Sequence, residues 1–125
     1  MKSIAVILAG GKGSRLNRLR EKQFIEVSGY SILEHTLKKF SECYNKKNLL
    51  IVLPIDKLTK QELNTYKKYT LHKFIINGST RKQSVKNSIK YIKSLDKTPE
   101  NILIHDSARP NISTKLINNI KNNIH

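Results

Sequence analysis

The chain contains few of the residues that mark several classes of protein. Among its 125 residues it has one cysteine, Cys43, no tryptophan and three prolines. A single cysteine cannot form an intrachain disulfide or a cysteine-rich zinc site. No apolar run approaches the roughly 20 residues of a membrane-spanning helix, and the first apolar run meets glycine too early for a signal peptide. We therefore expect one cytoplasmic domain, neither secreted nor inserted in a membrane.

Acidic residues are also scarce. The sequence has 9 Asp and Glu against 24 Lys and Arg, which gives a formal net charge of +15. A strongly basic domain is typical of proteins that bind nucleic acid. However, only five of these cations are arginines, no five like charges follow one another, and no aromatic residues alternate with basic ones. We favour solvated lysine faces, with binding of nucleic acid as the alternative.

Four short apolar runs predict buried β-strands. They lie at residues 3–8, 49–53, 73–77 and 101–105. Apolar residues at helical spacing fill the segments between and after them, and Ser79 or Thr80 is placed to cap one helix and Ser113 another. Strands that alternate with helices predict an α/β fold with a mostly parallel sheet and helices on both faces. Ligands of such sheets bind at the carboxyl ends of the strands.

A glycine-rich stretch, residues 8–16, follows the first run. Glycines let backbone N–H groups approach an anion closely. The stretch is not a P-loop, because Gly13 stands where Ser or Thr should follow the Gly-Lys pair, and Leu16 breaks the dinucleotide fingerprint. Two cations, Arg15 and Lys22, are close in sequence. We interpret the stretch as a phosphate-binding loop of another kind, and a plain tight turn is the alternative.

Asp106 is the one carboxylate placed directly after a predicted buried strand. A carboxylate at a strand end that faces a phosphate loop is a common way to hold a divalent metal for phosphoryl chemistry. Alternatively, Asp106 caps a turn or pairs with Arg109. Together with the glycine-rich stretch, the position favours the metal.

Ordered motifs along the whole chain resemble those of sugar-phosphate cytidylyltransferases. They are Leu-Ala-Gly-Gly-Lys-Gly-Ser-Arg at 8–15, Glu-Lys-Gln-Phe at 21–24, Ser-Ile-Leu-Glu-His at 31–35, Asn-Gly-Ser-Thr-Arg-Lys-Gln-Ser-Val at 77–85 and His-Asp-Ser-Ala-Arg-Pro at 105–110. In particular, they resemble the 2-C-methyl-D-erythritol 4-phosphate cytidylyltransferase family of non-mevalonate isoprenoid synthesis. Ribitol-5-phosphate cytidylyltransferases share these motifs.

The resemblance implies a Rossmann-like nucleotidyltransferase fold. It implies an enzyme that moves CMP from CTP to a sugar-alcohol phosphate, releases pyrophosphate, uses Mg²⁺ and forms a homodimer at full length. Fixed cations would stabilise the charge that builds on the α-phosphate. The implied residues are Arg15 and Lys22 as catalytic groups, Asp106 as the metal ligand, Ala9, Gly10, Gly11 and Gly13 around the nucleotide, Gly78 and Ser84 on the cytosine, and Ser107 and Arg109 near the ribose and substrate.

The chain also departs from the family pattern. Glu21 stands where the family usually has proline, and Ser79 where it often has an acidic residue. Family chains continue well beyond residue 125, so we expect residues 1–125 to be the nucleotide-binding portion of one nucleotidyltransferase domain whose C-terminal portion is absent. Three alternatives stay open: ribitol 5-phosphate as the acceptor, a nucleotide with another base such as UTP as the donor, and a basic module that binds nucleic acid without catalysis.

Overall fold

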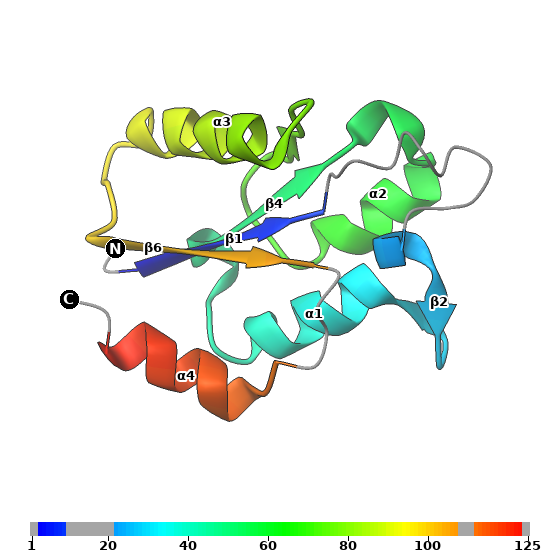
Figure 1. The fold of residues 1–125 in the computed structure, drawn as a ribbon, viewed down its shortest axis with the longest axis horizontal. Coiled ribbons are helices and arrows are strands. Elements are labelled where there is room, and N and C mark those ends of the chain that lie inside the picture. Colours follow the sequence, from blue (N-terminus) through cyan, green and yellow to red (C-terminus); the bar gives the residue numbers. More distant parts are fainter. Residues whose placement is uncertain (1–2, 10–21, 108–111, 124–125) are drawn as a thin grey trace.

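A computed structural model describes residues 3–9, 22–107 and 112–123. Figure 1 shows a twisted sheet between two layers of helices. The sheet contains β1 (Ser3–Leu8), β4 (Leu49–Leu53), β5 (Ile75–Ile76) and β6 (Asn101–Asp106). Their order is β5-β4-β1-β6, and all three pairings are parallel. This confirms the predicted parallel α/β sheet.

Helices cover both faces of this sheet, as predicted. One face carries α1 (Ile32–Ser41), α2 (Lys60–Lys67) and α4 (Thr114–Asn123), and the other carries α3 (Arg81–Lys93). The connections that the structure describes contain single turns of 3-10 helix, η2 (Lys22–Phe24), η3 (Lys46–Asn48) and η4 (Ile55–Lys57). A two-stranded hairpin of β2 (Glu26–Val27) and β3 (Tyr30–Ser31) precedes α1.

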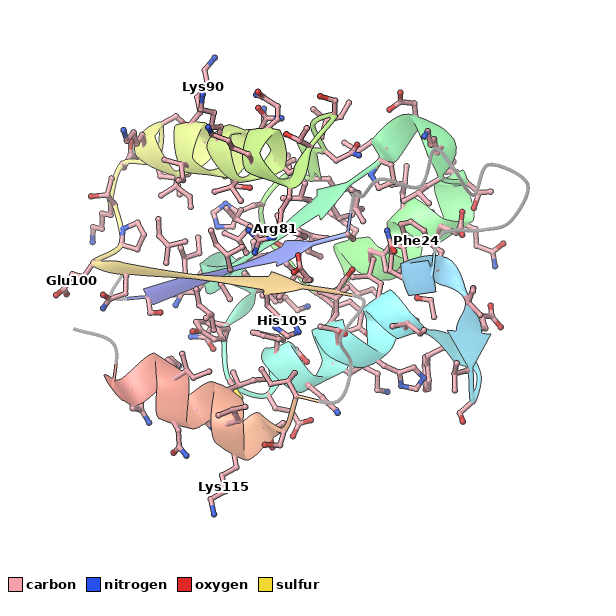
Figure 2. All side chains as sticks on the ribbon, viewed as in Figure 1. Phe24, Arg81, Lys90, Glu100, His105 and Lys115 are labelled. Carbon is pink, nitrogen blue, oxygen red and sulfur yellow. The ribbon has the colours of Figure 1, made fainter. Side chains whose placement is uncertain are left out.

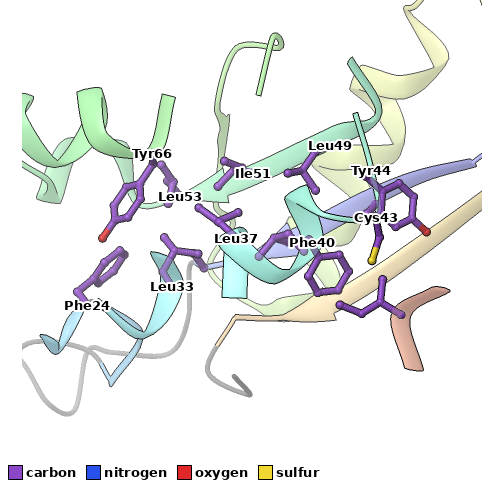
Figure 3. Close-up of a cluster of buried hydrophobic side chains, with 14 residues drawn as sticks. Phe24, Leu33, Leu37, Phe40, Cys43, Tyr44, Leu49, Ile51, Leu53 and Tyr66 are labelled. Carbon is purple, nitrogen blue, oxygen red and sulfur yellow. The ribbon is translucent and has the colours of Figure 1, made fainter. Parts of the chain in front are cut away.

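Strand β1 divides the core in two because successive side chains of a strand point to opposite faces. Ala5 and Ile7 join the cluster under α1, α2 and α4, which Figure 3 shows in close-up. Ile4 and Val6 join the second cluster, under α3. All six residues of β1 are buried. A strand covered on both faces reads as a continuous apolar run, which is why the sequence reveals it.

Hydroxyl side chains begin the helices where the sequence predicted them. Thr80 accepts the backbone N–H of Gln83 at the start of α3, so Thr80 rather than Ser79 is the cap. Ser113 accepts the backbone N–H of Leu116 at the start of α4. Each bond satisfies one of the N–H groups that a helix leaves unpaired at its first turn.

Two of the predicted strands differ from expectation. Strand β5 has two residues instead of the five at 73–77, because only Val52 and Leu53 of β4 pair with it. The segment before β5 is tied to β4 by a side chain instead: the Thr70 hydroxyl donates to Leu49 O. Strand β6 is half-buried rather than buried on both faces, since it pairs only with β1 among the described residues.

Candidate functional site

The strand ends meet at one edge of the sheet. The register aligns Leu8 of β1 with Val52 of β4 and with Asp106 of β6, and it aligns Val52 with Ile75 of β5. The residues that follow these positions therefore emerge side by side. From β1 the chain adds β4 and then β5 on one side, and it later adds β6 on the other side of β1. Open parallel sheets bind their ligands at such a switch point, between the two central strands. The edge at Leu8 and Asp106 is the candidate site.

Asp106 points to the face of the sheet that carries α3. It shares this face with Val6 and Leu8, its even-numbered counterparts on β1. Its Oδ1 lies 3.2 Å from Nε of Arg81, the first residue of α3, and this N–H donates to the carboxylate. The two side chains are 38% and 58% exposed, respectively. Figure 2 labels Arg81 near the centre of the view, between α3 and β6. Among the residues that the structure describes, the partner of Asp106 is Arg81. The pair with Arg109 stays a prediction, because Arg109 lies outside these residues.

Ala9 is fixed on both sides at the end of β1. Its N–H donates to Val52 O at 2.8 Å, and its C=O accepts the Gln23 side-chain amide at 2.6 Å. Gln23 is 8% exposed, and the neighbouring Phe24 packs its ring against Tyr66, with centroids 6.2 Å apart. The η2 segment is thereby held against the start of the glycine-rich stretch. Gln23 and Phe24 stand in the same motif as Lys22, but neither was predicted to be a site residue.

Ser107 extends the pairing of β6 by one residue. Its N–H donates to Leu8 O at 2.9 Å, and its C=O accepts the hydroxyl of Thr36 at 3.0 Å. Ser107 is 1% exposed, and Thr36 on α1 is completely buried. Thr36 was missed because a threonine among helical residues gives no sequence signal for a bond to a loop that comes 71 residues later.

Gly78 and Ser84 close the turn that leads into α3, with Gly78 before the helix and Ser84 in its first turn. The Gly78 N–H donates to Ser84 Oγ at 2.9 Å, and Ser84 is 1% exposed. A Cβ at position 78 would lie 2.3 Å from Gln83 Cγ, which is closer than any real contact, so only glycine fits. The structure thus joins the two residues that were predicted to recognise the cytosine, and it places them beyond β5 at the same edge as Asp106.

Several predicted site residues cannot be placed. Those outside the described residues are Gly10, Gly11, Gly13, Arg15 and Arg109. Lys22 is described only by its backbone, at the start of η2. The structure accordingly brings together Ala9, Asp106 and Ser107, with Gly78 and Ser84 along the same edge.

Among the described residues, the side chains with shifted pKa values lie in the packed interior and not at the strand ends. Burial raises the pKa of the Cys43 thiol, which agrees with the interpretation of this residue as a small buried hydrophobe. Burial also raises the pKa of Tyr69, whose hydroxyl donates to Glu34 Oε2 at 2.6 Å. Neither group is poised as a nucleophile or a base at the strand ends.

A lone carboxylate fits one kind of metal site. Within residues 3–9, 22–107 and 112–123 no three His, Cys, Asp or Glu side chains gather in a way that could hold an ion. Mg²⁺ commonly takes one or two carboxylates from the protein and completes its shell with water and substrate phosphates. Asp106 at a half-exposed strand end suits this mode of binding and not a cage made by the protein alone.

Comparison with known proteins agrees with this geometry. The family model of 2-C-methyl-D-erythritol 4-phosphate cytidylyltransferase, IspD, matches residues 3–124. The chain belongs to this family. The IspD protein of Clostridium perfringens strain SM101 is 40% identical over 118 residues, which are 93% of this chain and 51% of that protein. The corresponding Thermosipho melanesiensis protein is 38% identical over 117 residues, 92% of this chain and 51% of its own length.

A solved structure supports the fold of this IspD-family chain. A crystal structure of 4-diphosphocytidyl-2C-methyl-D-erythritol synthase superposes with a TM-score of 0.73 at 24% identity, over 98% of this chain and 54% of that one. The chain thus spans about half the length of the curated relatives it matches. None of the helices among the described residues has the length and apolar character to cross a membrane.

Proposed function

We propose that this IspD-family chain binds CTP at the carboxyl edge of its sheet and contributes that half of the site to a cytidylyltransferase. The acceptor would be 2-C-methyl-D-erythritol 4-phosphate, the substrate named for the family. The observation that carries the proposal is the meeting of Ala9, Asp106 and Ser107 at the point where the strand order reverses.

The proposed reaction is an in-line displacement at phosphorus. An oxygen of the acceptor's phosphate forms a bond to the α-phosphorus of CTP. At the same time the bond from the α-phosphorus to the oxygen that bridges the α- and β-phosphates breaks, and pyrophosphate leaves with that electron pair. Negative charge is greatest on the α-phosphate in the transition state, and positioned cations lower the barrier by stabilising it. We assign this role to Arg15 and Lys22.

The remaining residues would bind and orient the nucleotide. Gly10, Gly11 and Gly13 offer backbone N–H groups to the phosphates. The N–H of Ala9 donates to Val52 O and is therefore not free to bind a phosphate. We assign to Ala9 the positioning of the glycine-rich stretch that follows it.

The other strand ends would hold the base, the ribose and the metal. Gly78 and Ser84 would shape the cytosine pocket, and Ser107 and Arg109 would lie by the ribose. Asp106 would hold a divalent metal, proposed to be Mg²⁺, which when bound neutralises phosphate charge.

The test is CMP transfer by the full-length protein. Pyrophosphate release is measured with CTP and either 2-C-methyl-D-erythritol 4-phosphate or ribitol 5-phosphate, with UTP replacing CTP in a parallel series. We expect turnover only with CTP and the methylerythritol phosphate. A preference for ribitol 5-phosphate would overturn the acceptor assignment. Absence of transfer, combined with nucleic-acid affinity that falls steeply with salt, would favour the binding module instead.

The family membership also supports the expectations of a homodimer and of a cytoplasmic location for the full-length protein. Light scattering on the purified protein and fractionation of cells measure these two properties. A monomeric active enzyme would exclude the dimer as part of the site.

A further inference from the structure

The proposed metal ligand already holds a cation. Arg81 Nε lies 3.2 Å from Asp106 Oδ1, and Arg81 is the one ion-pair partner of Asp106 in the described part of the chain. The contact joins two sequence motifs, residues 77–85 and 105–110. Nothing in either motif predicts that Arg81 and Asp106 lie next to each other.

The fold fixes this pair through two independent features. The register of β6 with β1 sends the Asp106 side chain to the α3 face of the sheet. The Thr80 cap and the bond from Gly78 N–H to Ser84 Oγ set where α3 begins, and Arg81 is its first residue. Arg81 therefore lies beside Asp106 at the carboxyl edge of the sheet, where we propose that the nucleotide binds.

Electrostatics gives this position a consequence. A guanidinium in contact with a carboxylate competes with any divalent cation for the same oxygen and repels that cation. An ion pair whose members are 58% and 38% exposed is weak and is readily exchanged for another partner. Phosphate oxygens are a suitable new partner, because the planar guanidinium can donate two parallel hydrogen bonds to them, whereas its contact with Asp106 is made through Nε at 3.2 Å.

We propose that Arg81 is a further binding residue for the nucleoside triphosphate. Its guanidinium pairs with Asp106 before the nucleotide arrives, and it moves to a phosphate group when the metal binds that carboxylate. The inference rests on the proposed function, in which Asp106 binds a metal. Its consequence is an order of binding: the metal enters with the nucleotide, and metal alone binds weakly.

The experiment measures two affinities of the full-length protein, that for Mn²⁺ alone and that for CTP in the presence of Mn²⁺, by electron paramagnetic resonance and calorimetry. In Arg81→Gln, we expect Mn²⁺ alone to bind about 3- to 10-fold more tightly, because the competing charge is gone. We expect CTP with Mn²⁺ to bind at least about 10-fold more weakly, because a charged hydrogen bond to phosphate is lost. The opposite signs distinguish this role from a general loss of structure, which would weaken both.

Lys82→Gln is the matched control, since it removes the same charge from the next, exposed residue. We expect both of its affinities to stay within about 2-fold of wild type, which is the effect of an exposed charge at a distance. If Arg81→Gln behaves like Lys82→Gln, or if it leaves CTP binding unchanged, the inference is wrong. Arg81→Lys should keep Mn²⁺ binding near wild type and recover CTP binding only in part.

Asp106→Asn separates this inference from the proposed function. Loss of Mn²⁺ binding in Asp106→Asn supports the metal site, and the Arg81 variants then decide the inference alone. Unchanged Mn²⁺ binding in Asp106→Asn would overturn the metal site and the inference with it.

Discussion

Replacement of Gly78 by alanine tests the turn that holds the proposed cytosine pocket. The new methyl carbon would lie 2.3 Å from Gln83 Cγ and 2.4 Å from its Cβ. Neither atom is the free end of the side chain, so the start of α3 has to shift. Overpacking of this kind costs about 1–3 kcal/mol, and loss of the bond from Gly78 N–H to Ser84 Oγ adds about 1 kcal/mol. We expect the free energy of unfolding to fall by about 2–4 kcal/mol.

The same shift should weaken CTP binding. Ser84 and the backbone of Gly78 would move together. We expect the affinity for CTP to fall about tenfold, which corresponds to about 1.4 kcal/mol of binding free energy. Urea unfolding and calorimetry with CTP on the full-length protein measure the two effects.

Gly29→Ala is the control for this experiment. Gly29 has φ +87° with nothing within 4 Å of its added Cβ, and it lies in the hairpin turn. Alanine at this position should lower the free energy of unfolding by about 1–2 kcal/mol, the cost of a left-handed backbone for a residue with a side chain. It should leave the affinity for CTP unchanged. If Gly78→Ala keeps wild-type CTP affinity, or is as stable as wild type, the reasoning about this turn is refuted.

Three further substitutions test separate parts of the site. Lys22→Ala should lower kcat by on the order of 10²–10³ while CTP binds within a few-fold of wild type, because we assign the lysine to stabilisation of the transition state; steady-state kinetics with an unchanged kcat would make it an ordinary surface lysine. Ser84→Ala should weaken CTP binding more than it slows turnover of the bound nucleotide, since it removes the acceptor that closes the turn; single-turnover kinetics separates the two, and a purely kinetic defect would contradict the assignment. Thr36→Val should lower the free energy of unfolding by about 1–3 kcal/mol, because the buried Ser107 carbonyl loses its donor; a variant as stable as wild type in urea would show that this bond contributes nothing.

The sheet could be predicted from sequence because its central strands are covered on both faces. β1 and β4 are buried along their whole length, and such strands appear as uninterrupted apolar runs. The two-residue strands are different. The β2–β3 hairpin consists of Glu26–Val27 and Tyr30–Ser31 and has no apolar alternation, because most of its residues are exposed. Its local signal is the turn, where Ser28 and Gly29 have φ +55° and +87°.

The site was predictable only as far as its motifs. Asp106 and Gly78 could be proposed from the sequence because one ends an apolar run and the other stands in a recognisable motif. The Arg81–Asp106 pair was not, because it depends on the register of β6 and on the residue at which α3 begins. Gln23 was missed for a similar reason: its bond to Ala9 O exists only once η2 has folded back onto β1.

The central position of β1 also has a consequence for how the chain folds during synthesis. Its six residues, Ser3–Leu8, leave the ribosome before the other described strands of the sheet, and they carry no charge. Their partners arrive much later, since Ala5 pairs with Leu49, and Ser3 with Asn101. Pairing between residues so distant in sequence is slow, because the entropy of closing the loop is lost before any contact forms. Until then an uncharged apolar hexamer with strong β-propensity stays exposed, which is the kind of segment that nucleates aggregation and that molecular chaperones bind.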